Sequence, residues 1–310
     1  MTAKNINYFL MDGTPNGRIK CTISNWTGVA FRIPRTALEK CKERDDLKQS
    51  GVYFLFGVDE ETGNDLVYVG QAGVRKNGEG VLYRLSEHKR NADKDYWTEA
   101  IVFTTSNNSF GPTEISWLEN RFCALANDAQ RYIVKNGNDP SLGNVTEEKQ
   151  SELEEFVEYA KIVMGVLGHK LFEPLVTPMS KLSLDEYGIS ENSDNLLYLQ
   201  RTIKKSGITV VATCLQTAEG FVVKRGSVIE QESAKSLSPV MIAKRKNAKI
   251  DEEGILQEDI LFNSPSYAAM FVIGNHANGR VEWKSADGKS LKDMESGESV
   301  DEESLSENEQ

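Results

Sequence analysis

A short stretch of the chain brings together the residue types that phosphodiester hydrolysis needs. An attack on phosphorus develops negative charge on the non-bridging oxygens, which an arginine side chain can stabilise. A glutamate can hold a divalent metal ion, and a tyrosine or a histidine can take the proton of the attacking water. All of these types occur within about 70 residues of one another, as Tyr53, Tyr68, Arg84, His88 and Glu119.

The local patterns predict which elements carry these side chains. Two apolar runs, 51–57 and 66–70, flank a polar loop rich in Asp, Glu, Gly and Asn. This pattern predicts a β-hairpin with one tyrosine on each strand. A helix expected over 81–91 places Arg84 and His88 four residues apart, and therefore on one face.

Glu119 interrupts the apolar stripe of a second expected helix, 113–128, and a strand over 100–105 precedes that helix. The resulting order, β-β-α-β-α, predicts a small α/β domain. Aromatic side chains also pack across hairpins for structural reasons alone, so the two tyrosines keep that alternative interpretation.

The segment 48–140 resembles the GIY-YIG nuclease family. Its two short motifs are Gly51-Val52-Tyr53 and Tyr68-Val69-Gly70, each with valine in place of the usual isoleucine. The family's arginine on the first helix corresponds to Arg84. A histidine that some members carry one turn later corresponds to His88.

The same resemblance points to a metal ligand and to a late polar residue. The family's metal-binding glutamate corresponds to Glu119. Its late polar residue, commonly asparagine, corresponds to Asn136, with Asn138 close behind. Arg75, in a glycine-rich insertion, competes with Arg84 for the arginine position. Arg84 is preferred for its helical context and for the histidine one turn later.

The resemblance implies hydrolysis of DNA with one divalent cation, Mg²⁺ or Mn²⁺, held by the glutamate. The implied catalytic residues are Tyr53, Tyr68, Arg84, His88, Glu119 and Asn136. The resemblance does not fix the general base. We favour Tyr53, with Tyr68 and His88 in support.

Residues 207–292 carry a second resemblance, through the segments 221–227, 261–269 and 278–284. They are similar to a domain of uncharacterised function that commonly follows bacterial GIY-YIG domains, and to modules proposed to bind DNA in restriction-type systems. The basic residues that could contact phosphates there are Lys224, Arg225, Lys244, Arg245, Lys246 and Arg280.

Simpler interpretations compete with DNA binding in this region. The basic residues could form only a solvated surface. Ser264-Pro265 is typical of a helix N-terminus, and Trp283 suits a hydrophobic core.

These patterns predict an α/β (α+β) protein built from several parts. The parts, in chain order, are a strand/helix extension (1–47), a GIY-YIG-like nuclease domain (48–140), a helical connector and linker (141–206), a DNA-binding or targeting domain (207–292) and a disordered acidic tail (293–310). Two single elements are also expected: a charged helix over 36–49 and a final strand over 281–284.

The net charge of the 310-residue chain is −11, which by itself argues against a nucleic-acid partner. The distribution of the charges removes that objection. Residues 293–310 hold eight acidic side chains and no basic one, whereas residues 1–140 hold 18 of each sign. Residues 191–292 hold 14 basic side chains against 12 acidic ones. DNA therefore stays a reasonable partner.

Other classes of protein are disfavoured. No apolar run approaches the roughly 18 residues that span a bilayer, and the first residues have no apolar signal core. We therefore expect a cytoplasmic protein with no membrane partner. None of the four cysteines pairs with another at CxxC spacing, which disfavours a zinc site or a disulfide framework. The cysteines are expected to be buried, and no small-molecule cofactor is expected.

The sequence thus predicts a metal-dependent DNA endonuclease, with a role in restriction or in defence against foreign or modified DNA. Two alternatives are a structure-specific nuclease of DNA repair and a non-catalytic nucleic-acid-binding regulatory protein. Against the second alternative, an inactive domain has no chemical reason to retain Glu119. The patterns carry no signal for an oligomeric state.

Overall fold

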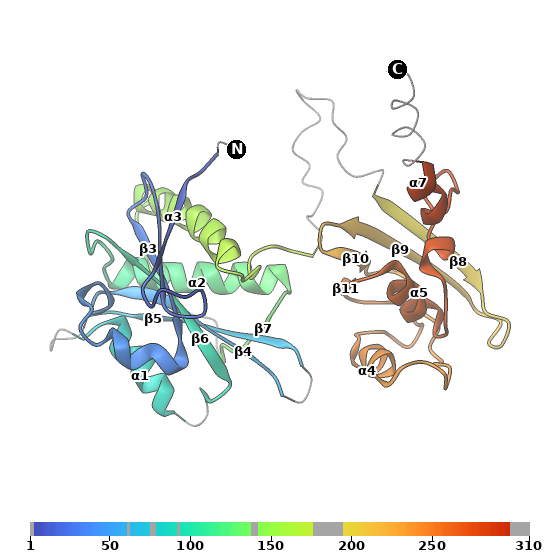
Figure 1. Cartoon of the computed structure of the whole chain (residues 1–310), viewed down its shortest axis with the longest axis horizontal. Helices are drawn as coiled ribbons and strands as arrows, with labels where there is room; N and C mark the ends of the chain where they lie inside the picture. Colours follow the sequence, from blue (N-terminus) through green and yellow to red (C-terminus); the bar gives the residue numbers. More distant parts are fainter. Residues whose placement is uncertain are drawn as a thin grey trace, which may run out of the picture. The chain divides into compact units, whose positions relative to one another are not determined.

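The computed structural model describes residues 3–60, 63–74, 79–91, 94–137, 142–175 and 195–297. The chain divides into two units, Met1–Pro174 and Leu175–Gln310 (Figure 1). The first contains a seven-stranded sheet with helices, and the second a four-stranded antiparallel sheet with helices. The expected α/β (α+β) class is confirmed. Over the described stretches, no helix is long and apolar enough to cross a membrane.

The large sheet is antiparallel apart from one parallel pair, β5 with β7, and its strand order is β1-β2-β3-β6-β4-β5-β7. Residues 1–47 are therefore not a separate extension, because they supply three strands of this sheet. The strands are β1 (Ile6–Leu10), β2 (Ile19–Ile23), β3 (Gly28–Pro34), β4 (Gly51–Val58), β5 (Asp65–Ala72), β6 (Trp97–Thr105) and β7 (Ile133–Val134).

Helices cover both faces of the sheet. The helices α2 (Pro112–Ala129) and α3 (Glu147–Val166) pack on one face, and α1 (Val81–Arg90) packs on the other (Figure 1). The sequence predicted α1 and α2 with ends that differ by one residue at most, and α3 lies in the expected helical connector.

The prediction of one continuous charged helix over 36–49 is wrong. Two 3₁₀ helices, η1 (Arg35–Cys41) and η2 (Asp45–Leu47), occupy this segment. Arg44 has an extended backbone between them, which breaks any longer helix. The carboxylate of Asp46 is paired with Lys20 on β2, so contacts with the sheet replace helical continuation.

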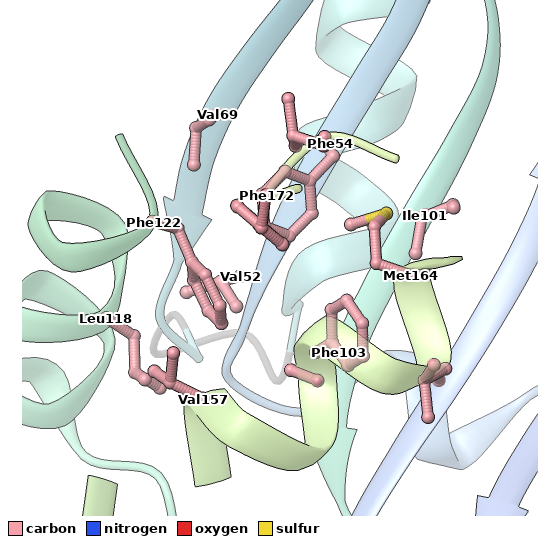
Figure 2. Close-up of a cluster of buried hydrophobic side chains, with 14 of the residues drawn as sticks. Val52, Phe54, Val69, Ile101, Phe103, Leu118, Phe122, Val157, Met164 and Phe172 are labelled. Atoms are coloured by element: carbon pink, nitrogen blue, oxygen red, sulfur yellow. The ribbon is translucent and has the colours of Figure 1, made fainter. Parts of the chain in front are cut away.

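The alternation of side chains along β4 builds the main core. Phe54 points to the face covered by α2 and α3, where its ring centroid lies 5.3 Å from that of Phe122 and 5.8 Å from that of Phe172. Figure 2 shows Val157 and Met164 of α3 completing this cluster. The expected connector, 141–206, therefore includes a helix that belongs to the core of the first unit.

The opposite alternation on β4 places Tyr53 on the face covered by α1. Tyr53 is directly opposite Gly70, and Leu55 is opposite Tyr68, so the two tyrosines are diagonal neighbours on one face. A Cβ atom on Gly70 would overlap the Tyr53 ring. On Gly51, a Cβ would lie 2.6 Å from the carbonyl oxygen of Phe103. Both motif glycines are thus explained by close packing.

The second unit has the strand order β11-β10-β9-β8. Its first strand begins at Leu196, so the linker expected through residue 206 ends earlier. The elements of this unit are β8 (Leu196–Thr202), β9 (Thr209–Thr217), β10 (Gly220–Val223), α4 (Pro239–Asn247), β11 (Ile260–Phe262), α5 (Pro265–Ile273), α6 (Gly279–Glu282) and α7 (Leu291–Gly297).

Two expectations fail near the end of this unit. The first half of the strand expected over 281–284 belongs to the short helix α6, and Lys284 forms isolated bridges with Tyr198 and Ser290. The expected tail overlaps α7 at residues 293–297, and residues 298–310 lie outside the described residues.

Two other expectations are confirmed. The Ser264 hydroxyl accepts a hydrogen bond from the backbone N–H of Tyr267 (3.2 Å) and so caps α5. Trp283 is fully buried, and its indole N–H donates to the carbonyl oxygen of Pro265 (2.9 Å). All four cysteines are free and buried, as expected.

The packing of Gly70 against Tyr53 leads to a test of the hairpin. A Gly70→Ala variant should destabilise β4 and β5 by about 1–3 kcal/mol, because its methyl group overlaps a fully buried ring. Hydrogen exchange of the β4 and β5 amides should then be about tenfold to a hundredfold faster. In the control Gly137→Ala, the added carbon meets no atom within 4 Å, so exchange should hardly change. Equal exchange in both variants would contradict this account of the motif.

Candidate active site

The centre of the candidate site is a contact between Tyr53 and His88. The Tyr53 hydroxyl lies 2.7 Å from Nε2 of His88, and the two side chains join β4 to α1. Both are buried, with only 1% and 4% of their surfaces exposed. A hydrogen bond of this length inside the protein fixes the orientation of both rings and provides a path for a proton.

Tyr68 on β5 completes an aromatic group around this contact. Its ring centroid lies 6.3 Å from that of Tyr53 and 5.4 Å from that of His88. Tyr68 is only partly buried. In this aromatic group, Tyr68 therefore lies on the solvent-facing side and the Tyr53 ring on the buried side.

The face shared by Arg84 and His88 is present as expected. Arg84 lies one turn before His88 on α1, and its charge acts on the pKa values of both Tyr53 and Tyr68. Arg84 is also paired with Glu87 at 2.8 Å, and 41% of its side-chain surface is exposed. The guanidinium thus keeps contact with solvent, from which a substrate would arrive.

Glu119 on α2 belongs to the same site. Burial raises the pKa of its carboxyl group, while hydrogen bonds from Gln71 and the charges of Arg84 and Lys94 act in the opposite direction. Gln71 directly follows Gly70 on β5. The hairpin therefore brings a carboxylate-binding amide to the point where α2 approaches the two tyrosines.

The electrostatics keep the central pair neutral at neutral pH. Burial, and then the nearby Tyr68, raise the pKa of Tyr53 above its ordinary value, although the charge of Arg84 acts against this. Burial, followed by the charges of Lys94 and Arg84, lowers the pKa of His88 to about 4. A neutral phenol beside a neutral imidazole can pass a proton but carries no charge of its own.

The side chain of Asn136 contacts the backbone of the second motif. Its side-chain amide donates to the carbonyl oxygen of Val69 (2.8 Å), and its Oδ1 accepts from the N–H of Val69 (3.0 Å). Both ends of the side chain are thus used to hold β5, between Tyr68 and Gly70. Asn136 therefore positions the second motif, and its assignment as a catalytic residue stays a prediction. Its competitor Asn138 lies outside the described residues, as does Arg75.

Two residues of the site escaped the sequence analysis. Gln71 contacts Glu119, and Lys94 lies over the Tyr68 ring with Nζ 3.1 Å from the ring centroid. Lys94 occupies the segment between α1 and β6, where the sequence has no periodic pattern. The only signal for Gln71 was its place directly after the second motif.

The structure separates the basic residues predicted to contact DNA. Arg245 is buried, and its guanidinium donates to the backbone carbonyl oxygens of Glu230 and Phe271. Arg245 holds the core of the second unit together, so its assignment to a DNA surface is wrong. A buried guanidinium that is satisfied by carbonyl groups cannot reach a phosphate.

The other five are at or near the surface but differ in their partners. Arg225 and Lys246 are exposed. Lys224 is paired with Asp259 (3.3 Å), and Arg280 with Glu295 (2.5 Å). The ammonium of Lys244 donates to the carbonyl oxygen of Leu261 (2.9 Å), although much of that side chain is exposed.

Comparison with known families matches residues 202–295 to a domain of unknown function, DUF4357. This match confirms that the C-terminal region resembles a domain of uncharacterised function. Neither the curated proteins nor the solved structures contain a match to the chain. The family match lies within the second unit, so it does not bear on the candidate site of the first.

The buried state of His88 predicts how stability depends on pH. Between pH about 6.5 and 4, the unfolded chain binds a proton at this position and the folded chain does not. Folding stability should therefore fall as the pH drops through this window, by at most about 3 kcal/mol from this residue. Urea unfolding at several pH values measures the effect.

A His88→Gln variant should be less stable at pH 7 but should lose less stability between pH 6.5 and 4. The matched control is His276→Gln, at an exposed position of the second unit. It should keep the pH dependence of the wild type. An unchanged pH dependence in His88→Gln would show that His88 is not held neutral.

Proposed function

We propose that the chain is a metal-dependent DNA endonuclease whose first unit hydrolyses phosphodiester bonds. The observation that carries this proposal is the Tyr53–His88 contact, with Tyr68, Arg84 and Glu119 grouped around it. These side chains come from β4, β5, α1 and α2, and they combine a proton path, a cation and a carboxylate. The resemblance of the two motifs to the GIY-YIG family supports the same reaction.

The donor atoms present suit Mg²⁺ or Mn²⁺. Across the described ranges, no three His, Cys, Asp or Glu side chains form a metal cluster. Mg²⁺ needs no such cluster, since one or two carboxylates, water and substrate phosphates commonly hold it. Glu119, with the Gln71 amide beside it, meets that requirement. A bound divalent cation would supply positive charge for the developing negative charge on the phosphate oxygens.

The protein's own side chains would bind the phosphate and transfer the proton of the attacking water. Arg84 would bind a non-bridging phosphate oxygen, sharing its guanidinium with Glu87. The Tyr53 hydroxyl would take the proton of the attacking water and pass its own proton to Nε2 of His88. The neutral state of both groups makes this transfer possible without a charged base in the resting site.

The second unit would bring the catalytic unit to its target. Its exposed basic residues Arg225 and Lys246 can contact phosphates, and Lys224, Lys244 and Arg280 can do so if they exchange their present partners. The pairing of a GIY-YIG-like unit with this kind of domain supports a role in restriction or in defence against foreign or modified DNA. Incision of damaged or branched DNA in repair is the second use of the same chemistry.

The nuclease proposal predicts the effect of removing the Glu119 charge. A Glu119→Gln variant should cleave DNA at least about a hundredfold more slowly, because a metal held at this site is worth several kcal/mol in the transition state. The assay incubates the full chain with unmodified, modified and branched DNA, each with Mg²⁺ or Mn²⁺.

The matched control is Glu158→Gln. Glu158 is an exposed carboxylate of α3 that pairs with Lys161, so this variant should cleave like the wild type. The proposal is lost if the wild type cuts none of these substrates. It is also lost if Glu119→Gln cuts as fast as the wild type.

A further inference from the structure

The Lys94 ammonium lies beside the candidate site without an assigned role. Its Nζ is 3.1 Å from the centroid of the Tyr68 ring, a cation–π contact. The residue comes from the segment between α1 and β6, whereas Tyr68 comes from β5. Lys94 therefore reaches the solvent-facing side of the aromatic group from a segment that carries none of the expected catalytic residues.

The charges around Lys94 do not neutralise it. Among the described residues, no carboxylate lies within ion-pair distance of its ammonium. Burial lowers the pKa of Lys94 to about 8, the charge of Arg84 lowers it as well, and only Glu119 acts in the opposite direction. A cation held beside another cation and partly removed from water is costly unless an anion joins them.

A second polar group of the same segment, the Tyr96 hydroxyl, also lacks a partner among the described residues. The hydroxyl of Tyr96 is buried and has no hydrogen-bond partner among the described residues. It lies near enough to Tyr68 for the two phenols to interact electrostatically. Among the described residues, the segment thus brings an ammonium without a carboxylate partner and a buried, unpaired hydroxyl to the neighbourhood of Tyr68. A phosphate oxygen would satisfy the ammonium, whose side chain is only partly buried.

We propose that Lys94 binds a phosphate group of the DNA substrate, as a second cation beside Arg84. This inference rests on the proposed function, because it takes DNA as the substrate. Arg84 shares its guanidinium with Glu87, so it offers a phosphate less than a full positive charge. Lys94 supplies the missing charge, and the Tyr68 ring holds its ammonium in place.

The salt dependence of DNA binding tests this contact without requiring cleavage. The full chain, in a metal-free buffer with a chelator, is titrated with a 20-base-pair duplex at several NaCl concentrations. Each phosphate contact contributes about 0.9 to the slope of log K against log salt. Lys94→Met should make the slope shallower by about that amount, whereas Lys94→Arg should keep it, because the charge is retained.

Lys161→Met is the matched control. Lys161 lies on α3, which covers the face of the sheet opposite to the one that bears Tyr68, and it pairs with Glu158. This variant should keep the slope of the wild type. In the presence of Mg²⁺, Lys94→Met should also lower kcat/KM for cleavage by roughly tenfold or more. Circular dichroism establishes that each variant is folded.

The outcomes separate this proposal from the nuclease proposal. If Lys94→Met binds with the slope of the wild type, Lys94 contacts no phosphate and the inference is overturned. The inference is also overturned if Lys94→Arg loses the slope as fully as Lys94→Met does. If the wild type never cuts but Lys94→Met still has the shallower slope, the nuclease proposal fails and the phosphate contact of Lys94 is supported.

Discussion

The ring of Tyr53 fills the space that Gly70 leaves open on the neighbouring strand, and from there its hydroxyl reaches His88. The rest of the candidate site depends on this packing. It fixes the register of β4 against β5, and that register places Tyr68 diagonally from Tyr53. It also holds α1 against the sheet through His88, so that Arg84 comes to the solvent side. A bulkier residue at position 70 would displace the ring on which all of these positions depend.

The sheet supports this arrangement by separating its two faces. One face, with α2 and α3, is a dry aromatic core around Phe54 (Figure 2), and it contributes no polar group to the proton path. The other face, with α1, carries the tyrosines. Glu119 reaches them from α2 near the end of β5, where Gln71 meets it. Asn136 holds this strand through both backbone groups of Val69, which substitutes for part of a neighbouring strand. Rigid elements thus position the polar groups, as precise chemistry requires.

The sequence was informative where local patterns decide the structure. Helical spacing placed Arg84 beside His88, and the two Gly/Tyr motifs predicted the hairpin. The sequence was misleading where contacts between residues far apart in the chain determine the structure. The strands of residues 1–47 join the large sheet through pairing with β6, which no local pattern encodes. Arg245 looks like a surface cation, yet backbone carbonyl groups from two other segments bury it. Lys94 is an isolated lysine in an irregular segment, and only the folded chain places it on Tyr68.

The central claim is that water, activated at the Tyr53–His88 contact, attacks a DNA phosphorus atom. The most direct measurement is cleavage of circular duplex DNA by the full chain with Mg²⁺ in ¹⁸O-labelled water, followed by mass spectrometry of the new ends. The account predicts cut DNA with one ¹⁸O atom in each new terminal phosphate. Intact DNA, unlabelled ends or a covalent protein–DNA product would contradict it.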